Sequence, residues 1–345
     1  MDEAVNWARG RDEADRARPT LKTIAALSGL AVATVSRALS DAPDIGEDTK
    51  RRVRDIAQRI GYRPNRAGVR LRTGKTNVIS LVLSTEHEMV NYSSRMIASV
   101  AGALRGTPYH LILTPYFADE DPLDPIRYIV ETRSADGVIL NQTEPDDARV
   151  KYLLDCGFPV ATHGRTNWTH PFADYDNEAF GWVAVQALVA RGRRRIGLVR
   201  PPFRQSYSIH CDCGVRDSAA RLGVAARVVD GANTDSPGEL LAGAVATAMR
   251  GPDRPDGLVV PSASAAMTVV TAAEDMGLEL GRDFDLVSKE AVPFLKRFRR
   301  DIVAIPEDVA LAGDFVARAL IHRIANPGEP PMQYLDVPDG HWDRP

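Results

Sequence analysis

An arginine and several small side chains occupy one side of residues 32–39, a combination that can read the edges of DNA bases. Val35 and Leu39 are spaced for the inner face of a helix. The residues left on the outer face are Val32, Ala33, Thr34, Ser36 and Arg37. Arginine can donate two parallel hydrogen bonds to guanine O6 and N7, and valine or alanine can contact a thymine methyl group. We therefore regard this outer face as a candidate DNA-reading surface.

Charged and hydroxyl side chains follow several apolar runs further along the chain, where they could bind a small polar molecule. In chain order these candidates are Glu86, Arg165, Ser262, Lys289 and Glu290. Carboxylate and guanidinium groups suit sugar hydroxyls because charge-assisted hydrogen bonds are short and directional. Each residue alone could equally be a solvated loop charge or a strand-end cap, so the prediction of a binding site depends on the whole set.

The elements that must position the DNA-reading surface lie between Thr20 and Leu71. Thr20 can cap a first helix that runs to about Ser28, and Gly29 suits the left-handed turn at a tight helix–helix corner. Ala25, Gly29 and Val35 have the spacing of a helix-turn-helix, with a small residue at the crossing, glycine in the turn and an apolar anchor. A third helix and a short hinge segment follow.

The charge distribution argues against a purely structural three-helix bundle. Residues 19–75 contain 12 Lys or Arg and 5 Asp or Glu, a net charge of +7, whereas the whole chain carries −3. The remainder therefore carries −10. A basic module on an acidic body is expected where one end neutralises phosphates, so the sequence predicts double-stranded DNA as a partner.

Three motifs in the first 71 residues resemble the lac repressor family of bacterial transcription regulators. They are Thr34-Val35-Ser36-Arg37-Ala38-Leu39, then Gly61-Tyr62-Arg63-Pro64-Asn65-Arg66, and Leu71 six residues after Asn65. The resemblance covers nearly all of the chain after about Thr20. It implies base contacts from Val32, Ala33 and Arg37, and phosphate contacts from Thr34, Ser36 and Asn65. It also implies that Leu71 wedges into the minor groove, which unstacks a base step and bends the duplex.

Two positions in the DNA-binding part depart from this family's pattern. Ala31 stands where the family often has a serine at the N-cap of the second helix, so that cap must come from elsewhere. Gly68, within the hinge helix at 65–72, lowers helix stability by about 1 kcal/mol relative to alanine. A hinge that folds only on DNA would tolerate this.

The effector positions implied by the resemblance also depart from the family. Ser262 and Ala263 stand where an Asn-Asp pair is common, Glu290 where aspartate is usual, and Cys211 where an arginine often grips the effector. Lys289 or Arg165 could supply the cation instead, so the effector could be phosphorylated or acidic.

The chain after residue 77 alternates short apolar runs with helical stretches. Strands are predicted at 78–83, 110–115, 137–140, 160–163, 196–199, 226–229, 258–261 and 284–288. Helices are predicted at 92–105, 177–190, 212–222, 238–249, 264–276 and 307–324, and a last run at 333–337 could return to the first lobe. Continuous apolar runs with crossover helices indicate buried parallel strands, and such sheets bind ligands at the carboxyl ends of their strands.

The predicted fold class is α/β, with a small all-α helix-turn-helix headpiece followed by two doubly wound parallel-sheet lobes that resemble periplasmic binding proteins. We expect a disordered arm at 1–18, the helix-turn-helix domain at 19–63, and a hinge helix and linker at 64–77. An effector-binding and dimerisation domain would occupy 78–345. Its first lobe would span about 78–175 plus the C-terminal return, and its second lobe about 192–305.

Composition favours a cytoplasmic protein that does not enter the membrane. No run of eighteen apolar residues exists, and the charged N-terminus lacks the apolar core of a signal peptide. Three cysteines cannot form a disulfide framework, which fits a reducing compartment. No apolar heptads follow Val337, so a dimer is expected rather than a coiled-coil tetramer.

Other classes of protein find less support in the sequence. An enzyme is disfavoured because no dinucleotide, Walker or nucleophile-elbow motif occurs at the strand–helix junctions. A periplasmic solute-binding protein would need an export signal and no basic headpiece. His210-Cys211-Asp212-Cys213 invites a zinc site, but Cys-x-Cys is too tight for the usual ligand spacing. We expect neither a metal nor another cofactor.

The function predicted from these observations is a sequence-specific repressor of carbohydrate-utilisation genes. Ser134-Ala135-Asp136-Gly137 and His163-Gly164-Arg165 resemble a proteobacterial subgroup linked to uptake of α-glucosides or other carbohydrates. A homodimer would bind a palindromic operator, and a sugar or sugar derivative between the lobes would change its DNA affinity. A nucleobase, sugar acid or sugar phosphate is the alternative effector.

Overall fold

The computed structural model describes residues 19–63, 68, 70, 74–84, 90–117 and 119–339, with the backbone alone at 90 and 91. The chain divides into two compact units, 1–76 and 77–345. No helix of the described residues is long and apolar enough to cross a membrane. The predicted arm at 1–18, Asn65 and Leu71 in the predicted hinge, and Glu86 all lie outside the described residues.

Between residues 19 and 63 the headpiece contains three helices, α2 (Leu21–Ser28), α3 (Val32–Leu39) and α4 (Glu47–Arg59). Thr20 caps α2 as predicted: Thr23 N donates to Thr20 Oγ1 over 3.3 Å, and Thr20 N donates to Thr23 Oγ1 over 3.1 Å. Gly29 ends α2 in the left-handed conformation, with φ of 70°. At Ala31 no side chain caps α3. The backbone at Gly29 therefore makes the corner, and α3 begins without a side-chain cap.

The headpiece core is small and formed by all three helices. Val35, the predicted anchor of α3, is fully buried, as is Ile24 of α2. The buried members of this core are Ile24, Val35, Ala38, Val53, Ile56 and Ala57. Burial of these side chains fixes α3 against its neighbours, which leaves the opposite face of α3 available for DNA.

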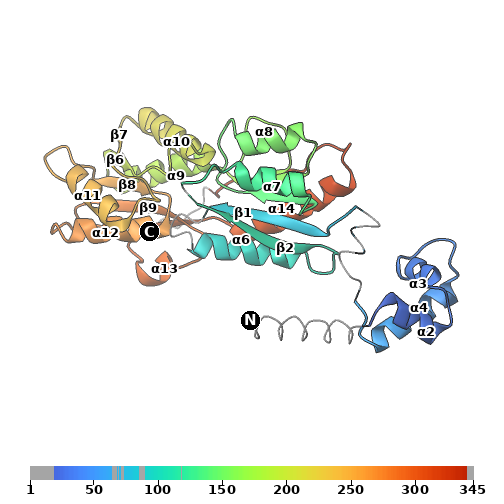
Figure 1. Cartoon of the computed structure of the whole chain (residues 1–345). Coiled ribbons are helices and arrows are strands. Elements are labelled where there is room, and N and C mark those ends of the chain that lie inside the picture. Colours follow the sequence, from blue (N-terminus) through green and yellow to red (C-terminus); the bar gives the residue numbers. More distant parts are fainter. Residues whose placement is uncertain are drawn as a thin grey trace, which may run out of the picture. The chain divides into compact units, whose positions relative to one another are not determined.

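The body contains two parallel sheets, one in each lobe (Figure 1). The first has the order β11-β5-β4-β3-β1-β2 and the second β10-β9-β8-β6-β7. First-lobe strands are β1 (Val78–Ser84), β2 (His110–Tyr116), β3 (Gly137–Leu140), β4 (Val160–His163), β5 (Phe172–Tyr175) and β11 (Gln333–Asp336). Second-lobe strands are β6 (Arg195–Leu198), β7 (Ala225–Val228), β8 (Gly257–Val260), β9 (Asp285–Glu290) and β10 (Val303–Pro306). The predicted return of the C-terminal run to the first lobe is confirmed, because β11 pairs in parallel with β5.

Helices cover both faces of each sheet, as the doubly wound prediction requires. In the first lobe, α6 (Val90–Ala103) and α14 (Val309–Ala325) pack on one face, and α7 (Asp124–Thr132) and α8 (Ala148–Asp155) on the other. Although α6 and α14 are far apart in sequence, they lie side by side (Figure 1). The second lobe places α9 (Asn177–Ala190) and α10 (Ser206–Leu222) on one face, and α11 (Gly238–Ala248), α12 (Ala263–Glu274) and α13 (Leu295–Phe298) on the other.

Several elements differ from those predicted, and two of the differences bear on the site. Strand β9 continues to Glu290 rather than ending at Ser288, and α10 begins at Ser206 rather than near Asp212. Sequence reasoning also missed β5, β10, α7, α8 and α13. Helix α9 and strand β3 have the predicted ends.

Helices α9 and α10 cross in very close contact through two glycines. A Cβ atom added at Gly214 would lie 2.0 Å from Glu178 O, and one added at Gly181 would lie 2.6 Å from Cys211 O. Both of these neighbours are backbone atoms, which cannot relieve a clash by rotating about a side-chain bond. The absence of side chains at these two positions thus allows the crossing.

We expect Gly214→Ala to lower the free energy of unfolding by about 1–3 kcal/mol, because overpacking forces the two helix backbones apart. Gly243→Ala in α11 is the matched control, since a Cβ there meets no atom within 4 Å. The control should be neutral or gain about 0.5–1 kcal/mol from reduced chain entropy. Urea unfolding measures both variants, and equal stabilities would contradict the close crossing.

Candidate DNA-reading face and effector cavity

The outer face of α3 presents the residues predicted to contact bases. Val32, Ala33 and Arg37 are exposed, whereas Thr34 and Ser36 are half-buried. The Arg37 side chain, 57% exposed, forms an ion pair between Nη2 and Asp44 Oδ2. The structure thus brings five of the predicted DNA contacts onto one helix. Asn65 and Leu71 lie outside the described residues, so their roles stay predictions.

A cavity of about 150 Å³ lies between the lobes, at the carboxyl ends of the strands of both sheets. Its first-lobe lining includes Tyr92, Gln142, Thr143, His163, Gly164 and Asp174. Its second-lobe lining includes Tyr207, Thr234, Asp235, Ser262, Ser264 and Lys289. Asn177 and Glu307, from segments that connect the lobes, complete the polar part. This is the position at which doubly wound sheets bind ligands.

Lys289 forms the polar centre of the cavity. Its Nζ lies 2.8 Å from Glu307 Oε2 and donates to Asn177 Oδ1 over 2.9 Å. The same Nζ lies 4.9 Å from the ring centroid of Tyr175 and 5.7 Å from that of Tyr207. Because a buried charge is costly unless it is paired, these contacts explain how a lysine only 9% exposed can sit here.

A second polar group joins Tyr92, His163 and Glu307 on the first-lobe side. His163 Nε2 lies 4.0 Å from Glu307 Oε1, and the Tyr92 hydroxyl bonds to His163 Nδ1. Burial lowers the pKa of His163 and raises that of Tyr92, so both side chains stay neutral near pH 7. Neutral hydroxyl and imidazole groups can exchange hydrogen bonds with ligand hydroxyls without attracting an ion.

The predicted effector residues fall into four groups. Ser262 and Lys289 line the cavity; Ser262 also caps α12 and lies 3.1 Å from Ser264, Oγ to Oγ. Arg165 does not line the cavity itself. Its Nε donates over 2.7 Å to Oδ2 of Asp174, and Asp174 is a lining residue. Glu86 lies outside the described residues.

The fourth group, Cys211 and Glu290, does not line the cavity. Cys211 is fully buried between α9 and α10, where burial raises its pKa to about 12 and keeps it a thiol. Glu290 accepts a hydrogen bond from Leu295 N over 2.8 Å, at the start of α13. Adjacent strand residues point to opposite sides, so Lys289 enters the cavity and Glu290 does not.

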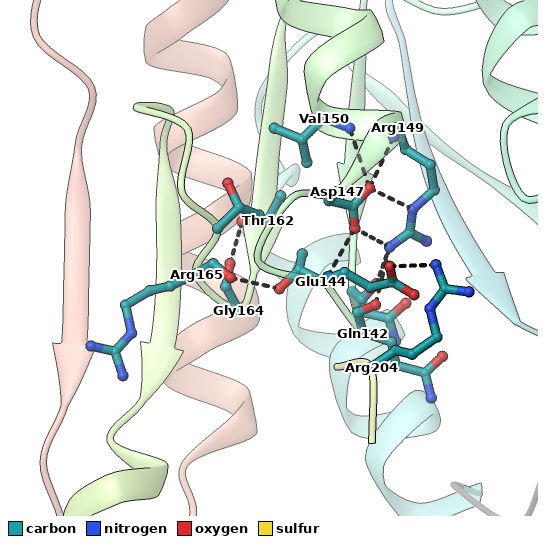
Figure 2. A network of polar contacts seen from close by, with 12 residues as sticks. Gln142, Glu144, Asp147, Arg149, Val150, Thr162, Gly164, Arg165 and Arg204 are labelled. Atoms are coloured by element: carbon teal, nitrogen blue, oxygen red, sulfur yellow. Dashed lines mark hydrogen bonds and ion pairs between the residues drawn. The ribbon is translucent and has the colours of Figure 1, made fainter. Parts of the chain in front are cut away.

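A buried ion pair supports the loop that carries Gln142 and Thr143 into the cavity (Figure 2). Arg149 Nη2 lies 2.7 Å from Asp147 Oδ2 and also donates to the carbonyls of Asn141 and Gln142 over 3.2 and 3.1 Å. Two contacts then join this loop to the second lobe. Glu144 pairs with Arg204 at 3.1 Å, and Ser206 N donates to Thr143 O over 2.8 Å.

Sequence reasoning missed several lining residues, and the reason differs among them. Glu307 follows β10 and Asp174 lies in β5, the two strands that the apolar pattern did not reveal. Tyr207 lies in the first turn of α10, five residues before the predicted start of that helix. Signals existed for Asn177, which begins a helix whose ends were predicted correctly, and for Gln142 and Thr143, which follow the correctly predicted β3.

Among the residues that the structure describes, no group of three or more His, Cys, Asp or Glu side chains could hold a metal ion. Cys213, next but one to Cys211, is exposed on α10. The chemistry of the cavity is therefore that of hydrogen bonds, one paired ammonium group and aromatic faces.

Comparisons with known proteins place both units in one family. Residues 20–65 match the model described as bacterial regulatory proteins, lacI family, and residues 185–344 match a periplasmic binding protein-like domain. The chain is 30% identical over 326 residues to the HTH-type transcriptional regulator AglR of Rhizobium meliloti (strain 1021), covering 91% of this chain and 90% of the relative. It is 38% identical over 194 residues to the HTH-type transcriptional regulator RafR of Escherichia coli, covering 55% of this chain and 57% of the relative.

Two solved structures share the fold. The transcriptional regulator CelR–cellobiose complex aligns with a TM-score of 0.68 at 21% identity, over 93% of this chain and 98% of that one. The lac repressor dimer bound to operator and the anti-inducer ONPF aligns with a TM-score of 0.77 at 18% identity, over 93% and 97%. The predictions of the fold class and of a regulator rather than an enzyme are confirmed. The chain is a helix-turn-helix transcriptional regulator and belongs to the lacI family of bacterial regulatory proteins.

Proposed function

We propose that this regulator represses carbohydrate-utilisation genes in the cytoplasm, and that a neutral sugar bound between its lobes changes its affinity for DNA. The observation that carries the choice of ligand is the charge of the cavity. Its described lining contains the carboxylates of Asp174, Asp235 and Glu307 but one cation, Lys289, already paired with Glu307. An acidic or phosphorylated ligand would meet net negative charge, whereas sugar hydroxyls can bond to every one of these groups.

A protein with the same fold, CelR, forms a complex with cellobiose, which supports a carbohydrate as the ligand here. Ser262 and Lys289 would bind the sugar directly, and Arg165 would act through Asp174. Movement of one lobe against the other would strain the contacts that Glu144 and Thr143 make with the second lobe. The ligand could thereby alter how the hinge, predicted at 64–77, presents the headpieces.

A homodimer on a palindromic operator is the second part of the proposal. Strand β2 lies at the edge of the first-lobe sheet, where Ile112 and Leu113 are 45% and 46% exposed. Phe117, just beyond the strand, is 55% exposed. An apolar edge strand is a surface that proteins usually cover. The related lac repressor dimer bound to operator supports this arrangement. Val32, Ala33 and Arg37 would then read bases, Thr34, Ser36 and Asn65 would contact phosphates, and Leu71 would enter the minor groove.

Selection from a pool of randomised duplexes, followed by titration with ligands, tests this proposal. We expect enrichment of an inverted-repeat site, and a change in its affinity of about 5- to 150-fold with a neutral mono- or disaccharide. Sugar acids, sugar phosphates and nucleobases are the comparison ligands. Failure to enrich any site would refute the DNA-binding assignment. Enrichment with a response to sugar phosphates alone would refute only the neutral ligand.

A further inference from the structure

The loop between α3 and α4 places a carboxylate on the arginine predicted to read a base. Arg37 extends from the exposed face of α3, and its Nη2 pairs with Oδ2 of Asp44, seven residues later. The two side chains are 57% and 47% exposed, so solvent or DNA can reach both. In the free headpiece Arg37 is therefore already engaged by a charged partner.

The loop that carries Asp44 is itself held in place. Asp41 Oδ1 pairs with Arg54 at 2.6 Å and with the buried Lys50 at 3.2 Å, which ties the loop to α4. Ala42 N donates to Arg37 O over 3.0 Å, and Ile45 N donates to Ala42 O over 3.2 Å. These bonds fix the backbone on both sides of Asp44. The carboxylate consequently meets Arg37 from a defined direction.

An arginine on a DNA-reading helix has two competing partners. Any phosphate attracts its charge regardless of sequence, whereas guanine O6 and N7 accept hydrogen bonds in one geometry. A neighbouring carboxylate compensates the charge and reduces the attraction to phosphates. Because the guanidinium has five N–H donors, those that Asp44 does not use remain available to a base edge.

We propose that Asp44 is a positioning residue for base choice, acting through Arg37 by orienting its guanidinium and disfavouring contacts with phosphates. The proposal relies on the proposed function, in which Arg37 contacts a base. It extends that function to a residue that need not touch DNA.

Asp44→Asn in the full chain, tested beside Asp48→Asn, examines this proposal. Asp48 is the matched control because it is an exposed carboxylate of the same headpiece and forms an ion pair with Arg51. Loss of one negative charge should tighten binding to mixed-sequence DNA in both variants, and more in Asp44→Asn, which also frees Arg37 to contact phosphates. Only Asp44→Asn should lower discrimination at the base pair read by Arg37, by about three- to fivefold, the size expected of an exposed ion pair. Equilibrium binding to the selected site and to its single-base variants measures this.

The Arg37→Ala background separates the possible outcomes. Arg37→Ala should remove preference at one position of each half-site, and adding Asp44→Asn should then change nothing further at that position. Unaltered base preference in Asp44→Asn, with the preference lost in Arg37→Ala, would overturn the role of Asp44 and leave the proposed function intact. No selected site for the wild-type chain would overturn both. Thermal unfolding of the variants excludes a general loss of folding as the cause.

Discussion

Replacing Lys289 with methionine is expected to weaken effector binding and to destabilise the body. The ammonium group is the one cation among the described lining residues, so a sugar loses its charge-assisted donor. Loss of such a bond lowers affinity by about tenfold to a hundredfold. The same change leaves Glu307, 9% exposed, without its ion-pair partner at 2.8 Å. An uncompensated buried charge costs about 3–5 kcal/mol of the free energy of unfolding.

The double variant Lys289→Met, Glu307→Gln distinguishes the two effects. It removes both charges, so most of the lost stability should return, because burial of an ion pair gives little net stabilisation. The affinity for the sugar should stay as low as in Lys289→Met. Urea unfolding gives the stabilities, and calorimetry with the sugar found in the ligand titration gives the affinities. If methionine at 289 left the sugar affinity unchanged, the cavity would not be the effector site.

Lys289 also shows how much of the site could be predicted from the sequence. Its place near the carboxyl end of an apolar run was enough to predict that a parallel sheet would present it at the ligand edge. Its partners could not be predicted in the same way. Glu307 follows β10, a four-residue strand that ends at a proline, and Asp174 lies within the short β5, whose other residues are Phe172, Ala173 and Tyr175. Such strands exist because a neighbouring strand completes their hydrogen bonds, which no local pattern records.

The remaining predictions depended on where helices and strands begin and end. Helix α3 and helix α9 were predicted with correct ends, since apolar spacing marked the first and Asp176 caps the second. Cys211 was placed at the cavity by family resemblance alone, and in this chain the thiol is buried against α9 instead. Glu290 was placed there because β9 was ended two residues early. Because the strand continues through both positions, their side chains point to opposite faces, and only Lys289 reaches the cavity.

Replacing Arg149 with methionine is expected to lower the free energy of unfolding by about 3–5 kcal/mol and to weaken sugar binding. Arg149 and Asp147 are both buried, with 6% and 3% of their side chains exposed, and the pair holds the loop that carries Gln142 and Thr143 (Figure 2). Arg204→Met is the matched control. Arg204 forms an ion pair with Glu144, and the two side chains are 69% and 35% exposed. This replacement should therefore lower the free energy of unfolding by less than about 1 kcal/mol.

The pH dependence gives this prediction a signature that simple loss of packing would lack. Burial alone would raise the pKa of Asp147, but hydrogen bonds and the charge of Arg149 hold it below its ordinary value of 3.8. In the wild type the pair therefore stabilises the fold above about pH 4, and this contribution is lost as the pH falls through the lowered pKa. In Arg149→Met, burial dominates and the pKa rises, so protonation of Asp147 relieves the penalty. The stability gap between wild type and variant should narrow from pH 7 toward pH 4, and a gap independent of pH would show that the ion pair does not support this loop.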